Sequence, residues 1–334
     1  MESGNTLPLV SIIITSFNRA GMITKAIESA LMQDYPNLEV IVSDNCSSDD
    51  TENVVAKYSN DIRFRFSRNS ENIGMIPNFR KATYEVSKGE YLTYISSDDF
   101  LTDKSFVSDA MGVVARNPNI EIVHGRMSFN STRNNVLWNM PAEPYFLKEV
   151  WDGQDVFFKS IETGLLSWGA CLLKRSAMER VGGLKKEYHN ADLDANYKIM
   201  LNSNVGFINK LCYMQIGHTE NNGFPANADK LIFSLECFED VANYAVSVLP
   251  EKRNAIENWK EHFILYTVNI GMHSLIERDK VQYRLFKQKV KSLYPDLYKQ
   301  HTSGWIFRKM VLLQPFKSLI PPKVRTKIRK FIAG

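Results

Sequence analysis

Cysteine is scarce in this chain. Four cysteines occur among 334 residues, and no two stand at the short spacing of zinc ligands or redox motifs. A disulfide-stapled fold and a structural zinc site are therefore not expected. Isolated buried thiols in a reducing cytoplasm fit this usage better. The residues are Cys46, Cys171, Cys212 and Cys237.

Long apolar runs are also missing. The longest weakly polar run, residues 262–276, has 15 residues and contains two histidines and an asparagine, whereas a membrane span needs about 20 apolar residues. Residues 1–7 have neither a basic start nor an apolar stretch before a cleavage site, so no secretory signal is expected there. We expect a cytoplasmic protein that no segment anchors across a bilayer.

Acidic side chains are absent from residues 305–334, which hold eight Lys or Arg. The whole chain has a formal net charge of only +4, so the rest of it is slightly acidic. Apolar residues in this segment recur at the spacing of one helix face, between basic ones. They are Val324, Ile328, Phe331 and Ile332.

A basic amphipathic tail over residues 302–334 is therefore predicted. Such a helix can lie on an anionic membrane surface, which would place the protein peripherally on the cytoplasmic face. The alternative is that its apolar stripe packs on the protein's own helical region. Nucleic acid is not an expected partner, because no recognised binding fold accompanies the charge.

Strand-like and helix-like patterns alternate strictly through the first hundred residues. This order predicts a mainly parallel sheet flanked by helices, in which ligands bind outside the carboxyl ends of the strands. The expected strands are residues 9–15, 38–44, 62–67 and 90–96, and the expected helices are 20–33, one from about residue 51, and 77–87.

Residues 226–301 have helical apolar spacing throughout, so a helical region is expected to follow an α/β domain of residues 1–225. Between residues 105 and 217 the pattern is less regular. It predicts a helix at 105–116, a strand at 121–124, a hairpin within 125–150, a strand at 169–175, a helix at 192–201 and one or two strands in 205–217.

Acidic residues follow several predicted strands or begin predicted helices. Asp44, the pair Asp98/Asp99, and Asp192 with Asp194 stand at such positions. Aspartate is also common in ordinary turns, so no one of them alone indicates a site. In an extended chain Ser96 and Asp98 point to the same side, and a carboxylate there could hold a hard divalent cation.

Several separated motifs resemble those of family 2 inverting glycosyltransferases of the GT-A fold. The resemblance covers about the first 220 residues and implies a Rossmann-like, mainly parallel sheet followed by an α-helical carboxyl-terminal region. The motifs, in order, are VSIIITSFNR (10–19), VIVSDNCSSDDT (40–51), Asn72-Ile73-Gly74, YISSDD (94–99), GGL (182–184) with ADLD (191–194), and His218.

The resemblance implies a site for a nucleotide-sugar donor. Asp44 would accept a hydrogen bond from the N3–H of a pyrimidine, which suits UDP and dTDP sugars alike. The other implied nucleotide-binding residues are Thr15, Phe17, Asn18, Arg19, Asn72, Gly74, Ser96 and Ser97.

The resemblance also implies the chemistry. Asp98 and His218 would hold Mn²⁺ or Mg²⁺ against the diphosphate, although His218 could instead be a structural imidazole. Asp192 would act as the general base that takes the proton of the acceptor hydroxyl, and a single displacement would invert the anomeric carbon. Further contacts to donor or acceptor are expected from Asp99, Trp168, Gly169, His189, Asn190 and Asp194.

Trp168 could be an aromatic platform for a sugar or a core residue, and Asp194 could instead orient its helix. Three positions depart from the family pattern. Ser96 replaces a usual Asp, Ala191 replaces a usual Glu, and residues 78–80 read Asn-Phe-Arg in place of Ala-Arg-Asn. Arg80 could therefore reach the diphosphate or lie in solvent.

The leading interpretation is an enzyme that transfers a hexose to a glycan or lipid-linked acceptor. A sugar-phosphate nucleotidyltransferase is less favoured, because no Gly-rich basic loop follows the first strand. A catalytically silent nucleotide-sugar sensor or membrane scaffold is a further alternative, motivated by Ser96 and Ala191. Neither the sugar, the acceptor nor the oligomeric state follows from these residues.

Overall fold

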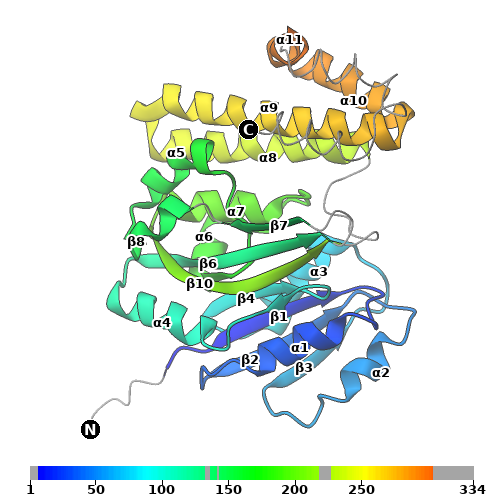
Figure 1. Cartoon of the computed structure of the whole chain (residues 1–334), viewed down its shortest axis with the longest axis vertical. Coiled ribbons are helices and arrows are strands. Elements are labelled where there is room, and N and C mark those ends of the chain that lie inside the picture. Colours follow the sequence, from blue (N-terminus) through cyan, green and yellow to red (C-terminus); the bar gives the residue numbers. More distant parts are fainter. Residues whose placement is uncertain (1–6, 132–135, 141–142, 218–226, 304–334) are drawn as a thin grey trace. The chain divides into compact units, whose positions relative to one another are not determined.

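The β-branched runs of the first hundred residues form parallel strands, as the sequence predicts (Figure 1). The computed structural model describes residues 7–131, 136–140, 143–217 and 227–303. The elements of this first part are β1 (Val10–Ser16), α1 (Ile23–Leu31), β2 (Leu38–Asp44), α2 (Thr51–Ala56), β3 (Phe64–Arg68), α3 (Met75–Lys81), the π-helical turn η1 (Ala82–Val86) and β4 (Tyr91–Ser96).

The middle of the chain adds shorter strands and helices. The hairpin expected within residues 125–150 is formed by β6 and β7, and the segment 205–217 is one strand, β10. The elements are β5 (Phe100–Leu101), α4 (Phe106–Arg116), β6 (Ile120–Ser131), β7 (Val136–Met140), η2 (Glu143–Leu147), β8 (Val150–Trp151), α5 (Gly153–Thr163), β9 (Cys171–Lys174), α6 (Arg175–Val181), α7 (Ala191–Met200) and β10 (Asn204–Gly217).

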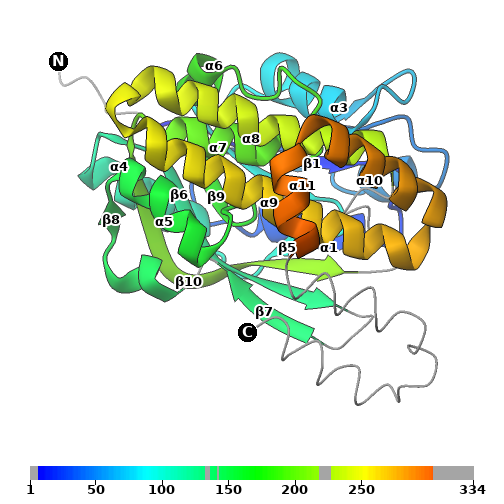
Figure 2. The same cartoon turned by 90° about the horizontal axis from the view of Figure 1, so that it is seen from above.

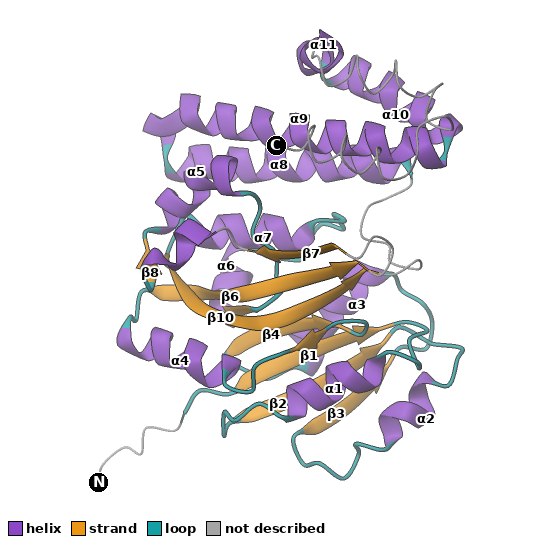
Figure 3. Ribbon diagram, in the orientation of Figure 1, coloured by secondary structure: helices purple, strands orange, loops and turns teal. Residues whose placement is uncertain are grey.

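These strands form one mixed sheet with the order β3-β2-β1-β4-β9-β6-β10-β5 (Figure 3). β7 pairs with β6 and β8 pairs with β10. Strands β1 to β4 are parallel, as are β6 and β10, whereas β9 runs antiparallel to both of its neighbours. The expected GT-A-like sheet, mostly parallel and flanked by helices, is therefore confirmed.

The two faces of the sheet are separated by the alternation of side chains along each strand. Ile12 and Ile14 pack into one core with residues of α1 and α4. The side chains that point to the opposite face of the sheet lie against α3 and η1. There the Tyr94 hydroxyl lies 2.9 Å from the Thr83 hydroxyl. Figure 1 shows α1 on the near face of the sheet and α3 on the far face. Both faces of the central strand β1 are covered, which is why Ile12, Ile13 and Ile14 form a continuous apolar run there.

The carboxyl-terminal region is helical, as predicted. Its elements are α8 (Ala228–Val248), η3 (Pro250–Lys252), α9 (Arg253–Arg278), α10 (Lys280–Leu293) and α11 (Pro295–Ser303). Figure 2 shows α8 and α9 side by side. No helix in the described part of the chain is both long and apolar enough to cross a bilayer.

Two compact units can be distinguished. One contains residues 1–222 with 239–259, and the other contains 223–238 with 260–334. Within the second unit the ring of Phe238 stacks on that of Phe263 with centroids 5.6 Å apart, and Lys289 pairs with Asp229 at 2.8 Å. The predicted basic tail, residues 302–334, lies almost wholly outside the described residues, so its helix stays a prediction.

Candidate active site

Three strand ends meet at one edge of the sheet. In the parallel register Ser16 lies opposite Asp44, and Thr15 lies opposite Ser96. The loops that follow β1, β2 and β4 therefore leave the sheet side by side. This is the edge at which open α/β sheets bind ligands, and it carries the residues expected to hold the nucleotide.

Asp44 is fully buried at the end of β2. Its Oδ2 accepts a hydrogen bond from the amide of Ser47 at 2.9 Å, its Oδ1 accepts one from the Ser47 hydroxyl, and Arg68 Nε lies 3.7 Å away. Ser47 and Arg68 were not expected at the site. The spacing Asp-x-x-Ser at a strand end is a turn signal that could have identified Ser47.

The loop after β1 is tied to the loop after β2. The amide of Asn18 donates to the Ser47 hydroxyl at 2.8 Å, and Asn18 Oδ1 accepts from the amide of Ser48 at 2.8 Å. Asn18 has a φ of 52°, a left-handed conformation that asparagine tolerates better than most residues. Phe17 beside it is 42% exposed, so its ring is available at the surface next to Asp44.

Thr15 and Arg19, the other two residues expected near the base, are half-buried at the two ends of this loop. The amide of Arg19 donates to the Thr51 hydroxyl at 3.3 Å, and its guanidinium donates to the carbonyl of Asn18 at 3.1 Å. Ser16, between the two, has a buried hydroxyl with no hydrogen-bond partner in the described part of the chain.

Asn45 joins the Asn72–Gly74 loop to the end of β2. Its Nδ2 donates to Asn72 Oδ1 at 2.7 Å and to the Gly74 carbonyl at 3.2 Å, while its Oδ1 accepts from the amide of Ile73 at 3.0 Å. Gly74 has a φ of 94°, which L side chains rarely adopt. Asn45 was not expected at the site, although it stands inside the motif that carries Asp44.

The departure at residues 78–80 has a structural explanation. Asn78 is buried, and its side chain donates to the Ser43 carbonyl at 3.0 Å and accepts from the Ser43 hydroxyl at 2.8 Å. Arg80 is half-buried and bound to the backbone before α7. Its Nε and one terminal nitrogen donate to the carbonyls of Leu184 and Lys185 at 2.7 and 3.0 Å.

Exposure alternates along the segment after β4. Ser96 and Asp98 are half-buried, whereas Ser97 and Asp99 are buried. Asp99 accepts hydrogen bonds from the Tyr213 hydroxyl and the amide of Ile216, both at 2.8 Å. Burial, with a smaller contribution from the charge of Asp98, raises the pKa of Asp99 to about 7. Asp99 therefore fixes this turn to β10.

A ready-made metal cage is not found in the described part of the chain, where no three His, Cys, Asp or Glu side chains cluster suitably. Asp98 offers a half-buried carboxylate of the hard-oxygen type that Mn²⁺ and Mg²⁺ accept. His218, the second expected ligand, lies outside the described residues.

Asp192 stands in the first turn of α7. Burial raises its pKa to about 6, and backbone hydrogen bonds at Leu193 and Trp168 oppose part of that rise. Trp168 itself is 7% exposed, stacks on Tyr94 of β4 with centroids 4.3 Å apart, and donates from Nε1 to Asn196 Oδ1 at 2.7 Å. Trp168 thus contacts the Asp192 carboxyl group through its backbone, while its buried indole connects Asn196 of α7 to Tyr94 of the central sheet.

The remaining expected residues surround this helix start. Asp194 is buried and pairs with Lys198 at 2.5 Å, one turn along α7. A Cβ on Gly169 would lie 2.7 Å from Met127 Sδ, so a larger side chain here would require the flexible Met127 side chain to move. His189 and Asn190 are half-buried directly before α7.

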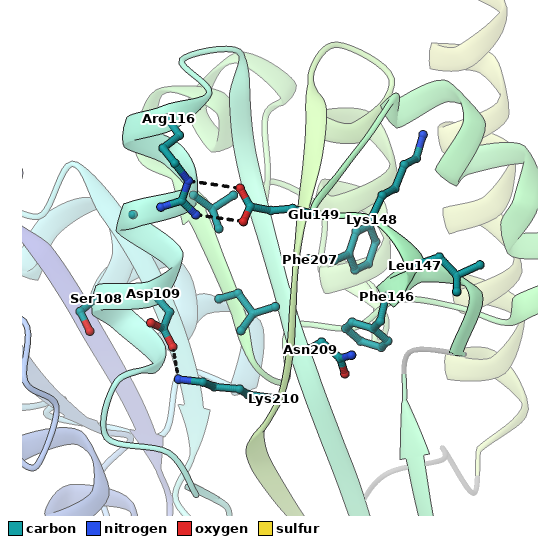
Figure 4. A pocket seen from close by; sticks show the side chains of 13 residues that line it. Ser108, Asp109, Arg116, Phe146, Leu147, Lys148, Glu149, Phe207, Asn209 and Lys210 are labelled. Atoms are coloured by element: carbon teal, nitrogen blue, oxygen red, sulfur yellow. Dashed lines mark hydrogen bonds and ion pairs between the residues drawn. The ribbon is translucent and has the colours of Figure 1, made fainter.

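A cavity of about 580 Å³ lies elsewhere, between α4, η2 and β10 (Figure 4). The charged side chains that line it form ion pairs with one another: Arg116 with Glu149 at 2.9 Å, and Lys210 with Asp109 at 2.7 Å. None of the expected site residues lines it. The strand-end site is therefore separate from this cavity.

Residues 11–182, about half of the chain, match the family model described as glycosyl transferase family 2. This chain belongs to glycosyl transferase family 2. It is therefore a transferase enzyme, and the silent-sensor alternative is not supported. The match includes the strand ends that carry Asp44 and Asp98 and stops before α7.

Characterised relatives share part of this sequence. The chain is 26% identical over 250 residues to a chondroitin synthase of Escherichia coli, which covers 74% of the chain and 34% of that protein. It is also similar to a GalNAc(5)-diNAcBac-PP-undecaprenol beta-1,3-glucosyltransferase of Campylobacter jejuni. The two are 39% identical over 97 residues, which covers 28% of this chain and 31% of that protein. The chain thus spans about a third of the length of these relatives.

Solved structures share the fold. TarS of S. aureus matches with a TM-score of 0.64 and 18% identity over 88% of this chain and 49% of that one. A mannosyltransferase of Pyrobaculum calidifontis, solved with GDP-Man and Mn²⁺, matches with a TM-score of 0.53 and 16% identity over 93% of this chain and 85% of that one.

Proposed function

We propose that this enzyme transfers a hexose from a UDP- or dTDP-sugar to a hydroxyl of a glycan or lipid-linked acceptor, with inversion at the anomeric carbon. The observation that supports this most is the parallel register that sets Asp44 and the Ser96–Asp99 segment beside the same end of β1. Neighbours in fold bind such donors: TarS has been solved with UDP-GlcNAc.

The donor's base would lie over the loops after β1 and β2. Phe17 offers an exposed ring there. The Ser16 hydroxyl, which has no partner in the described residues, and the Asp44 carboxylate are buried at the same strand ends and would have to be uncovered to contact the base. A carboxylate accepts the N3–H that uracil and thymine share, which is why the base is proposed as a pyrimidine. Thr15, Asn18, Arg19 and the Asn72–Gly74 loop would complete the nucleotide site.

Asp98 would hold Mn²⁺ or Mg²⁺ at the diphosphate. Because the described residues offer no three-residue cage, phosphate oxygens and waters would supply most of the other ligands, as is usual for Mg²⁺ bound with a nucleotide. Such an ion stabilises the charge that develops on the leaving diphosphate. We keep His218 as a proposed second contact.

Asp192 would take the proton from the attacking hydroxyl. A carboxyl group with a pKa of about 6 is a stronger base than an ordinary aspartate and is still roughly nine-tenths ionised at pH 7. Its titratable neighbours, Cys171 and Tyr197, both have pKa values raised by burial and stay neutral. A single displacement with one base inverts the anomeric carbon.

We also propose that residues 305–334 bring the enzyme to the cytoplasmic face of a membrane by binding anionic lipid. Each Lys or Arg near such a surface contributes about 1 kcal/mol. Sedimentation with phosphatidylglycerol vesicles, but not with phosphatidylcholine vesicles, would support this. Equal binding of a chain truncated after residue 303 would contradict it.

The donor can be identified by thermal unfolding with a panel of UDP-, dTDP- and GDP-sugars, with and without Mn²⁺. A ligand that binds only the folded chain raises its melting temperature. We expect a UDP- or dTDP-sugar to protect in a Mn²⁺-dependent way, and Asp98→Asn to remove the metal dependence. Protection by GDP-sugars alone would contradict the pyrimidine assignment.

A further inference from the structure

The turn between α6 and α7 has an unusual backbone. Gly182 and Leu184 both have left-handed φ values, 67° and 62°. Glycine adopts this conformation freely, but for a leucine it costs free energy and persists only where the surroundings hold it. The residues that hold this turn therefore matter for the segment it leads into, which carries Asp192.

Two side chains of the α3–η1 helix hold it. Arg80 donates to the carbonyls of Leu184 and Lys185 at 2.7 and 3.0 Å, and the Tyr84 hydroxyl donates to the Gly183 carbonyl at 2.8 Å. Three successive carbonyls are thus bound by residues one helical turn apart. The planar guanidinium can bind two carbonyls at once, which a lysine ammonium on a flexible stem does less well.

The far end of the same segment is fixed by another helix. Tyr188 is 1% exposed, and its hydroxyl donates to Asp240 of α8 at 2.6 Å; Lys186 pairs with the same carboxylate. Asn190 is the N-cap of α7, and Asp192 follows in the first turn of that helix. Between these two attachments, residues 185–187 are exposed.

Helix α3 is also attached to the donor side. It begins directly after Gly74 of the Asn72–Gly74 loop, and Asn78 binds Ser43 of β2 through two hydrogen bonds. One face of this helix therefore contacts the strand that ends in Asp44, while Arg80 and Tyr84 contact the turn before α7.

We propose that Arg80 and Tyr84 are positioning residues that set the location of Asp192 relative to the bound donor. This inference rests on the proposed role of Asp192 as the base. A base must lie within hydrogen-bond reach of the proton it takes, and a displacement of about 1 Å can cost up to 100-fold in rate. Loosening the turn should slow the chemical step and leave donor binding intact.

Arg175 provides a matched control. Its guanidinium donates to the Gly89 carbonyl at 2.6 Å, to the Ser87 hydroxyl at 2.7 Å and to the Thr83 carbonyl. It thus makes the same kind of backbone contact, but to η1 and the residues between η1 and β4 rather than to the turn before α7. Arg175→Lys should lower stability without a selective effect on turnover.

The test compares Arg80→Lys, Tyr84→Phe and Arg175→Lys in the full chain. Turnover is measured as the release of nucleoside diphosphate in the presence of Mn²⁺. The donor is the UDP-, dTDP- or GDP-sugar that the parent enzyme consumes fastest. We expect Arg80→Lys to lower kcat about tenfold and Tyr84→Phe about threefold, with KM for the donor changed less than twofold. Arg175→Lys should change kcat less than twofold.

A second readout does not depend on activity. Amide hydrogen exchange over residues 183–194 should accelerate in Arg80→Lys and stay at the parent rate in Arg175→Lys.

A third readout is the pH–rate profile. In Arg80→Lys its acid limb should shift to lower pH, because water reaching Asp192 would lower the raised pKa of that carboxyl group. Burial lowers the pKa of His124 to about 3, so this imidazole beside Cys171 and Phe207 stays neutral and does not add to this limb.

Equal losses of kcat in the two lysine variants, or unchanged exchange in Arg80→Lys, would overturn the positioning role. Asp192→Asn separates this from the proposed function. If Asp192→Asn retains turnover, the base assignment fails; if it abolishes turnover while Arg80→Lys matches Arg175→Lys, only the positioning role fails.

Discussion

The donor side and the base side of the site are built in different ways. Asp44, Asn18 and Asn45 stand at strand ends or in the loops that directly follow, and they are held by partners in the same or neighbouring loops, at most 30 positions away in the sequence. Asp192 depends instead on a strained turn bound by Arg80 and on a helix held by Trp168. The donor side therefore follows from the sheet, whereas the base side follows from packing between distant segments.

The sharpest way to separate the two sides is Asp192→Asn. Removing a general base costs 10²- to 10⁴-fold in rate, so kcat should fall by at least about 100-fold. Donor binding, followed by thermal protection, should stay close to that of the parent. The control is Asp155→Asn, which also removes a carboxylate from the first turn of a helix, α5, and should leave kcat unchanged.

Asp44→Asn should show the opposite pattern. The buried carboxylate loses its charge beside Arg68 and one acceptor for the Ser47 donors, so we expect donor affinity to fall roughly tenfold and stability by about 1–3 kcal/mol. Titration calorimetry with the nucleotide and urea unfolding measure the two effects. If Asp44→Asn lowered kcat while donor affinity stayed at the parent value, the division into a donor side and a base side would be contradicted.

The acid limb expected near pH 6 belongs to the base side, whereas Asp99, whose pKa burial raises to about 7, lies on the donor side. As the proposed base, Asp192 would be active when deprotonated. Burial raises its pKa to about 6, so its protonation should lower kcat/KM about tenfold per pH unit below pH 6. An ordinary aspartate would keep activity down to about pH 4. The fall in kcat/KM below pH 6 should be absent from the residual activity of Asp192→Asn.

The smallest effect concerns stability alone. Asn78→Ala removes hydrogen bonds to Ser43 and Asn69 and leaves buried groups unpaired, at a cost of about 1–3 kcal/mol. Lys289→Ala in the helical region breaks an exposed ion pair worth at most about 1 kcal/mol. Equal losses in urea unfolding would show that the asparagine network adds little to the donor side.

The same division governs what could be predicted from the sequence. Strands β1 to β4 follow from short apolar runs, and β2 was expected at its observed bounds. The buried face of α8 follows from the spacing of Leu231, Leu235 and Phe238, all of which are buried. These features depend on local periodicity, which a sequence displays directly.

Helices α5 and α6 and the contacts of Arg80 were not predicted. The Asp152 side chain caps α5 by accepting from the amides of Gln154 and Asp155, a signal that could have been recognised. Helix α6 has seven residues and follows β9 without a loop, so no boundary separates the two patterns. Arg80 and Leu184 are 104 positions apart, and no local pattern predicts such a pair.

Gly153, the first residue of α5, limits how this half of the molecule can change. A Cβ there would lie 1.9 Å from the carbonyl oxygen of Met200 and 2.2 Å from that of Ser203. Both are backbone atoms, one in the last residue of α7 and one three residues beyond it, and Asp192 stands in the first turn of that helix. Even alanine at position 153 would have to push that helix along or away, so a single methyl group outside the site would be felt at the base.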